Sequence, residues 1–260
     1  MLHHEISGNG KKPLVLLHGF MENTTIWNEM EAHLSKDFTL IKIDLPGHGK
    51  SKVYQEIHTV ELMAEKVKEV IDALKLEKIN LLGHSLGGYV SLAFAEKFPE
   101  ILESMTLFFS TTVADDEEKK AIRRRSIAVI DENFETFVKT SIPNLFSNNE
   151  KDILEGKIEL AKNIAKSTHK EGVKAAQLGM AERPDRTEIL ENLDAKILII
   201  AGKYDNAVKT ENLLKIIPEK TNIKTYVLDC GHNGHWEKPT ICAEIINTEL
   251  LHNLPKHFLL

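Results

Sequence analysis

Short apolar runs, each closed by a turn residue or a polar loop, recur along the first 110 residues and again after residue 190. They are Pro13–Leu17, Phe38–Ile43, Lys78–Leu82, Met105–Phe109, Lys196–Ala201 and Lys224–Leu228. The early runs are nearly continuous in apolar residues, not alternating, which is typical of strands buried on both faces of a parallel sheet. The pattern therefore predicts such strands in the first and last thirds of the chain.

Helical patterns separate these predicted strands. Thr59 can cap a helix whose apolar residues recur at helical spacing, and Leu86–Phe98 is rich in small and apolar residues up to Pro99. Amphipathic stretches also follow the two late runs, at Val208–Ile216 and Thr240–Leu251. Strands that alternate with helices indicate an α/β fold, with a mostly parallel central sheet flanked by helices.

The segment 111–190 has a different character. It holds 15 acidic and 14 basic residues among 80, with helical spacing throughout and no strand-like run. The predicted strands on either side have the same buried character, so we expect residues 1–110 and 191–260 to share one sheet. Residues 111–190 are then a helical insertion.

Composition and charge narrow the possible partners and location. The chain has 260 residues, 42% of them hydrophobic, which is enough to bury a core without disulfides. A net charge of −6 gives no reason to expect nucleic acid or an anionic membrane as a partner. The apolar runs are far shorter than the roughly 20 residues of a membrane span, and the first residues lack the order of a signal peptide. With only Cys230 and Cys242, we expect a cytoplasmic protein; no oligomeric state is predicted.

The strongest chemical signal is the segment Gly83–Gly88, with the sequence GHSLGG. It fits the motif G-x-S-x-G and lies between a predicted strand and a predicted helix, which is the context that this motif requires. A serine on so sharp a turn needs very small neighbours two residues before and after it. We therefore predict that Ser85 is a nucleophile at the start of a helix.

A serine nucleophile needs a base and a group that orients the base. Asp205 and His232 each follow a predicted strand, and the order Ser85, Asp205, His232 is the one expected for this strand-turn-helix architecture. Asp205 has the alternative role of a helix cap. Asp194 precedes its strand and Asp229 lies only three residues from His232, so both are weaker candidates.

His235 is the rival of His232, and the two histidines together raise the question of a metal. The sequence has no H-E-x-x-H pattern, and no third ligand is evident beside them. We therefore predict no metal site and expect His235 to be a solvated loop residue. The other histidines, His84 among them, have no assigned partner and are expected to be structural or exposed.

Acyl transfer also needs two N–H donors that face the oxyanion of the transition state. The backbone N–H of Leu86, directly after Ser85, is one candidate. The second is the N–H of Phe20, because Gly19 lets the chain turn after the first predicted strand. Phe20 and Leu86 are the predicted oxyanion hole.

Five motifs, in this order along the chain, resemble those of the α/β-hydrolase fold family. They are His18-Gly19-Phe20 with Trp27 downstream, Asp44–Ser51, Gly83–Gly88, Gly202–Asp205, and Gly231-His232 followed by Glu237 and Pro239. The chain is similar to small capped serine esterases and lactonases of this family. The resemblance implies that His232, five residues before Glu237, is the catalytic histidine. It also implies that residues 111–190 form a cap over the active site.

The resemblance also shapes the expected activity. It implies hydrolysis of a small carboxylic ester, thioester or lactone through an acyl-enzyme, with no metal or organic cofactor. Phe137, Phe146 and Trp236 are the predicted substrate-binding residues. Carbon–carbon bond hydrolysis, lyase chemistry and cofactor-free perhydrolysis on the same triad remain alternatives, and so does a ligand receptor on a hydrolase scaffold.

Overall fold

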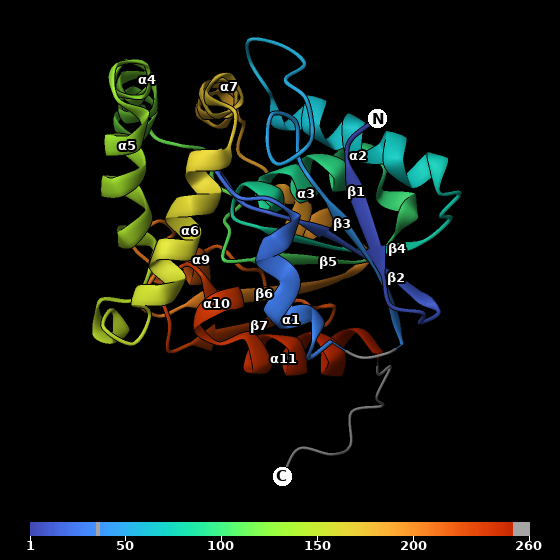
Figure 1. Ribbon diagram of the computed structural model, residues 1–260. Helices are drawn as coiled ribbons and strands as arrows, with labels where there is room; N and C mark the ends of the chain where they lie inside the picture. The colour runs from blue at the N-terminus through green and yellow to red at the C-terminus, as the bar shows by residue number, and fades with distance from the viewer. Residues whose placement is uncertain (35–36, 252–260) are drawn as a thin grey trace.

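A seven-stranded sheet forms the centre of the molecule in a computed structural model, which describes residues 1–34 and 37–251 (Figure 1). The strand order across the sheet is β1-β3-β2-β4-β5-β6-β7. The strands are β1 (His4–Ser7), β2 (Lys12–Leu17), β3 (Phe38–Ile43), β4 (Ile79–His84), β5 (Leu102–Phe108), β6 (Lys196–Gly202) and β7 (Ile223–Leu228). Only the edge strand β1 pairs antiparallel, with β3; the other pairings in the described sheet are parallel.

Apolar side chains leave the sheet in alternation and build one core on each face. Val15 and Leu17 of β2 belong to the first core, whereas Leu14 and Leu16 belong to the second. Helices that contribute to the first core are α2 (Val60–Ala73), α3 (Leu86–Lys97), α7 (Lys170–Glu182), α8 (Glu188–Asn192) and α9 (Thr210–Lys215). The second core includes residues of α1 (Asn28–Glu31), α10 (Gly234–Glu237) and α11 (Pro239–Leu251). Helices on both faces explain why the strands are apolar almost throughout.

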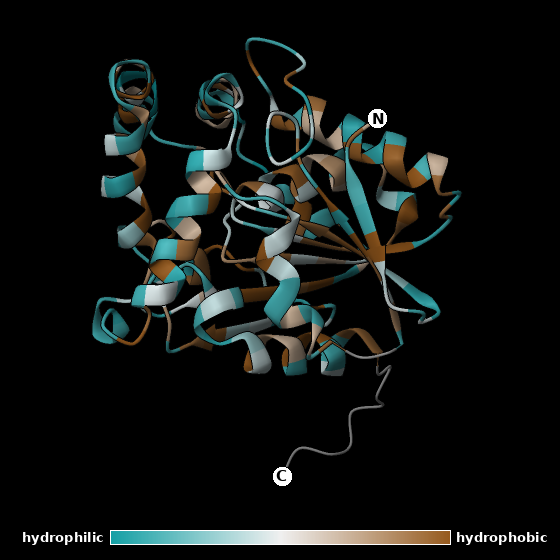
Figure 2. Ribbon diagram, viewed as in Figure 1, coloured by the Kyte–Doolittle hydropathy of each residue, from teal (hydrophilic) through white to brown (hydrophobic). Residues whose placement is uncertain are grey.

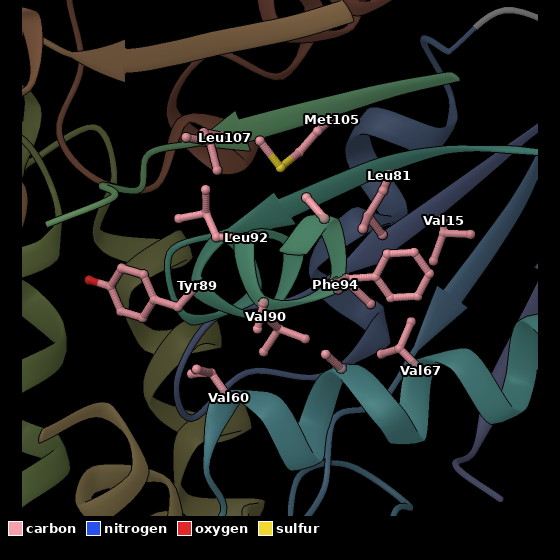
Figure 3. Packing of buried hydrophobic residues seen from close by; sticks show 14 of the residues in the cluster. Val15, Val60, Val67, Leu81, Tyr89, Val90, Leu92, Phe94, Met105 and Leu107 are labelled. Atoms are coloured by element: carbon pink, nitrogen blue, oxygen red, sulfur yellow. The ribbon is translucent and has the colours of Figure 1, made fainter. Parts of the chain in front are cut away.

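Helix α3 packs between the sheet and α2, as Figure 3 shows. Val90 and Phe94 lie between strand residues such as Leu81 and the α2 residues Val60 and Val67. All of these side chains are fully buried. This packing fixes the start of α3, which is the element that carries the predicted nucleophile.

Four longer helices lie between β5 and β6 and are grouped at the left of Figure 1. They are α4 (Glu117–Glu132), α5 (Phe134–Ser141), α6 (Glu155–Ser167) and α7 (Lys170–Glu182), with short 3-10 turns at Ile142–Leu145 and Asn148–Glu150. Helix α4 packs against α7, and α5 against α6. In Figure 2 the strands are largely brown, whereas these helices carry much teal. Two further 3-10 turns, Thr24–Trp27 and Pro99–Ile101, belong to the core.

The predicted strands all form, with bounds that differ by up to three residues. Thr59 caps α2 as expected, since its hydroxyl accepts the N–H of Leu62. Strand β1 was not predicted from the sequence, because it is four residues long and half exposed at the sheet edge.

Within the described residues, no helix combines the length and the apolar character that a bilayer crossing requires.

Candidate active site

Ser85 lies on a strained turn between β4 and α3. Its backbone has φ 50° and ψ −110°, and its N–H donates to the carbonyl of Phe108, 3.0 Å away. A side chain at Gly83 would put its Cβ 2.2 Å from the carbonyl oxygen of Gly87, and one at Gly87 would lie 2.4 Å from that of Leu17. The close approach of these backbones explains why the residues two before and two after the serine are both glycine.

Ser85, His232 and Asp205 come together in one hydrogen-bonded chain. The Ser85 Oγ lies 2.8 Å from His232 Nε2, and His232 Nδ1 lies 2.7 Å from Asp205 Oδ2. The other oxygen of Asp205 accepts the N–H groups of Ala207 and Val208, so the carboxylate is held in place from its own loop. Because the Nδ1–H of His232 donates to Asp205, the Nε2 atom of the ring is unprotonated and can accept the serine proton.

The loop that carries His232 is fixed from two directions. The carboxylate of Glu237 accepts the N–H of Gly231 at 2.8 Å and that of Ser147 at 3.1 Å. The His232 N–H donates to the carbonyl of Leu145, 2.8 Å away. Ser147 and Leu145 belong to the segment 111–190, so this segment directly supports the histidine loop.

The loop after β2 is oriented by His18. Nε2 of His18 accepts the N–H of Leu45 at 2.9 Å, so the proton is on Nδ1, which donates to the Gly19 carbonyl at 2.7 Å. In the planar trans peptide, the N–H of Phe20 points away from that carbonyl. Phe20 itself lines the cavity beside Ser85.

A cavity of about 780 Å³ opens above Ser85 and His232. Its wall combines residues that follow the strands with residues of segment 111–190, among them Phe137, Leu145 and Met180. This volume is in the range of sites for small molecules. The cavity therefore gives a small substrate room beside the serine.

Of the three predicted substrate-binding residues, only Phe137 lines this cavity. Phe146 is fully buried, and its ring stacks on Trp236 at a centroid distance of 6.0 Å and an interplanar angle of 3°. The prediction for Phe146 and Trp236 is corrected accordingly. The bond from Ser147 to Glu237 draws this part of the segment onto α10, so the two rings pack against each other.

One carboxylate and two guanidinium groups of the cavity wall are paired with each other. Asp115 binds both Arg123 and Arg183, and the Arg183 guanidinium also lies 4.0 Å from the ring centroid of Tyr89. Burial alone would raise the pKa of Asp115, but its two arginine partners outweigh this effect and lower the pKa to about 2. The carboxylate is thus ionised at neutral pH and neutralised by its partners.

Glu22 and His84 form a buried pair beside the hydrogen-bonded chain of Ser85, His232 and Asp205, and the sequence did not reveal this pair. Glu22 Oε2 accepts the N–H of Gly19 at 2.6 Å and faces His84 Nδ1 at 2.8 Å. Nε2 of His84 donates to the carbonyl of His232 at 3.0 Å. Burial would raise the pKa of Glu22, but the positive charge and hydrogen bond of His84 lower it to about 2. Burial would lower the pKa of His84, but Glu22 raises it above its ordinary value, so we treat the pair as charged.

His235 is fully buried, which corrects the expectation of a solvated loop residue. Its Nε2 lies 3.6 Å from Glu22 Oε1, and burial holds the pKa of His235 well below its ordinary value, so the ring is neutral. Glu22, His84 and His235 thus bring three metal-capable atoms within 4.8 Å of one another. However, Glu22 Oε2 and His84 Nδ1 lie 2.8 Å apart, closer than the roughly 3.3 Å between two ligand atoms that are each about 2 Å from a tetrahedral zinc ion. This geometry favours an ion pair over a metal site.

Comparisons with known proteins agree with this architecture. A thermophilic esterase from Thermogutta terrifontis, solved with malate bound, is 33% identical, with a TM-score of 0.89 over 96% of this chain and 93% of that one. The curated 2-hydroxy-6-oxononadienedioate/2-hydroxy-6-oxononatrienedioate hydrolase of Escherichia coli K12 is 27% identical over 91% of this chain and 86% of its own length. An enol-lactonase from Burkholderia xenovorans, at 20% identity, has the same fold, with a TM-score of 0.89 over 96% of both chains.

Some relatives are matched over a smaller part. An uncharacterized protein of Mycobacterium tuberculosis is 35% identical over 111 residues, which are 43% of this chain and 32% of that protein. The sequence profile described as alpha/beta hydrolase fold matches residues 12–154, more than half of the chain. With the parallel sheet and the turn at Ser85, this match identifies the chain as a member of the alpha/beta hydrolase fold family.

Proposed function

We propose that this protein is a serine hydrolase that cleaves a small carboxylic ester through an acyl-enzyme. The observation that carries the proposal is the hydrogen-bonded chain from Asp205 through His232 to Ser85, at the floor of a cavity. A serine paired with a base that is itself oriented by a carboxylate is the arrangement that acyl transfer uses.

In the proposed first half-reaction, the Ser85 Oγ attacks the ester carbonyl carbon while its proton moves to His232 Nε2. Asp205 keeps the ring oriented and stabilises the imidazolium. Collapse of the tetrahedral intermediate breaks the ester bond, and the leaving alcohol takes the proton from Nε2. In the second half-reaction, water attacks the acyl group, again with His232 as base, and releases the acid and free Ser85.

The developing oxyanion needs two N–H donors. We assign this role to the N–H groups of Phe20 and Leu86. The bond from His18 to the Gly19 carbonyl supports the first assignment, because it turns the Phe20 N–H the other way. Leu86 is the first residue of α3, where backbone N–H groups have no partner within the helix. The proposed steps require no metal or organic cofactor.

An uncharged ester fits the cavity better than a dianionic substrate does. Arg123 and Arg183 share the single carboxylate of Asp115, so this cluster keeps one net positive charge, which is fewer than the two carboxylates of a dianionic substrate would need. The identity of 33% with the Thermogutta esterase points the same way. Thioesters and lactones undergo the same chemistry at the carbonyl and belong to the proposed substrate class.

Carbon–carbon bond hydrolysis on the same triad is the second candidate. It is favoured by the relative from Escherichia coli, whose name specifies a dicarboxylate substrate and which matches most of the chain. On this alternative, Lys119 or Lys209 of the cavity wall would have to bind the substrate carboxylates. The paired arginines make this the weaker candidate.

A substrate panel separates these functions. p-Nitrophenyl esters of increasing acyl length would be assayed beside a lactone, a thioester and the carbon–carbon substrate 2-hydroxy-6-oxononadienedioate. The products would be analysed in each case, and Ser85→Ala would be the control. We expect turnover of short esters by the wild type and none by the variant. Cleavage of the carbon–carbon substrate alone would replace the proposal, and tight ligand binding without turnover would indicate a receptor.

A further inference from the structure

Three loops that the proposed mechanism uses meet at the buried pair of Glu22 and His84. The loop after β2 reaches the pair through the Gly19 N–H, 2.6 Å from Glu22 Oε2. The turn that carries Ser85 contributes His84 itself, the residue directly before the serine. The third loop reaches the pair through the His232 carbonyl, 3.0 Å from His84 Nε2.

The pair leaves little space for these loops to shift. A Cβ built on Gly19 would lie 2.7 Å from both Glu22 Oε2 and His84 Nδ1, so the backbone at Gly19 packs directly on the two side chains. Both side chains are buried, with 7% exposure for Glu22 and 1% for His84. Burying two charges together is expensive unless each finds good partners. Here the partners are backbone groups of the loops that are held.

We propose that Glu22 and His84 are positioning residues that act as one unit on the oxyanion loop, Ser85 and His232. This inference rests on the proposed serine-hydrolase function and extends it to two residues outside the triad. Neither residue exchanges a proton with the substrate in this proposal. Their role is to keep the Phe20 N–H, the Ser85 Oγ and the His232 ring in one geometry, because small displacements of reacting groups reduce rates strongly.

The charge of His84 is what couples the two hydrogen bonds. A doubly protonated ring donates from Nδ1 to Glu22 and from Nε2 to the His232 carbonyl at the same time. The titratable groups that face or influence this ring are Glu22, His18, Asp205, His232 and His235. Glu22 is the only group among these that contacts Nδ1 of His84. Removal of its charge therefore favours loss of the second proton.

The first test is Glu22→Gln, which keeps the shape of the side chain but removes the charge. We expect kcat for a p-nitrophenyl ester to fall about 10- to 100-fold, with KM changed less than about twofold, because the loss is in alignment and not in substrate binding. Nitrogen NMR of labelled histidine should show His84 doubly protonated at pH 7 in the wild type and singly protonated in the variant. A purely structural role would not produce this split between kcat and KM.

Arg186→Gln is the matched control, because it also removes a buried charge that is paired with carboxylates. Arg186 is 4% exposed and binds Glu61 and Glu96, and it does not line the cavity. We expect this variant to lower Tm at least as much as Glu22→Gln does while kcat stays at the wild-type value. A similar loss of kcat in both variants would attribute the effect to stability and overturn the proposal.

A double-mutant cycle with His84→Gln tests whether the two residues act as a unit. If they do, the double variant should lose no more kcat than the worse single variant. The double variant also avoids leaving one unpaired buried charge, so it remains informative if a single variant fails to fold. Independent, multiplying losses would contradict the proposal, and so would a stoichiometric metal ion found on these residues in the purified protein.

Failure of this inference differs from failure of the proposed function. If the wild type neither turns over esters nor reacts with a phosphonate at Ser85, the serine-hydrolase proposal falls. If the wild type does both and Glu22→Gln has wild-type kcat, only the positioning role falls.

Discussion

His232 and His235 lie three residues apart but have different surroundings. His232 bridges Ser85 and Asp205, whereas His235 is enclosed by aromatic rings, including Trp27 and Trp236, and contacts no triad member through a hydrogen bond. We therefore expect His232→Ala to lower kcat by a factor on the order of 10⁴ to 10⁶. His235→Ala should destabilise the fold, since it empties a buried site, but should change kcat far less. Steady-state kinetics and thermal melts of the two variants test this expectation. A larger loss of kcat in His235→Ala than in His232→Ala would exclude His232 as the base.

The resemblance to the family favoured His232 over His235, through the spacing from His232 to Glu237 and Pro239, and the structure joins His232 to Ser85. Glu237 accepts the N–H of Gly231 and so shapes the loop directly before His232. The pair of Glu22 and His84 could not be found this way. The two residues are 62 positions apart in the sequence, and neither belongs to a pattern that would distinguish it from an ordinary polar residue beside a turn.

At the scale of elements, Asp115 joins the two ends of segment 111–190. It lies just before α4 and binds Arg183, just after α7. We expect Asp115→Asn to lower the free energy of unfolding at pH 7 by about 2 kcal/mol. Because folding lowers the pKa of Asp115 from 3.8 to about 2, its contribution is complete above about pH 4 and is lost as the pH falls toward 2.

Urea denaturation at pH 7 and pH 2.5 checks this prediction, and the difference between wild type and variant should shrink at the lower pH. The control is Asp131→Asn, which removes an exposed pair with Lys174 and should leave the urea midpoint unchanged. A loss of stability in Asp115→Asn that did not depend on pH would argue against the ion pair as its cause.

The aromatic residues of the same segment divide into two groups. Phe137 faces the cavity, so Phe137→Ala should raise kcat/KM for longer acyl esters relative to short ones. Expressed as a difference in activation free energy, this change in preference should be at most about 1–3 kcal/mol per methylene-sized change. Phe146 is stacked on Trp236 away from the cavity, so Phe146→Ala should lower stability by about 3–5 kcal/mol and leave the preference unchanged. Measurement of kcat/KM for both variants on an ester series, together with their stabilities, tests both predictions. An equal loss on every ester for Phe137→Ala would remove it from the specificity pocket.

The strands were predictable because burial on both faces makes them apolar almost throughout, as in Ile197–Ile200 of β6. The helices of segment 111–190 were predictable in kind, but their packing was not. Phe137 and Phe146 look alike in the sequence, and their environments differ through contacts between distant residues, such as the bond from Ser147 to Glu237.

At the scale of the whole molecule, the site is made by parts that lie far apart in the chain. The sheet brings the loops after β2, β4, β6 and β7 to the same edge, and segment 111–190 closes the cavity over them. The same segment supports the loop of His232 through Leu145 and Ser147. We therefore propose that residues 111–190 are both the cap of this enzyme and a support of its histidine loop.

The central claim is that Ser85 becomes acylated during turnover. Intact-protein mass spectrometry after rapid acid quench of a reaction with a p-nitrophenyl ester tests it directly, with peptide mapping of the adduct. The account predicts an added mass equal to one acyl group, located on Ser85, that decays as acid is released and is absent in Ser85→Ala. Ester turnover by the wild type with no adduct, or with the acyl group on another residue, would contradict the account.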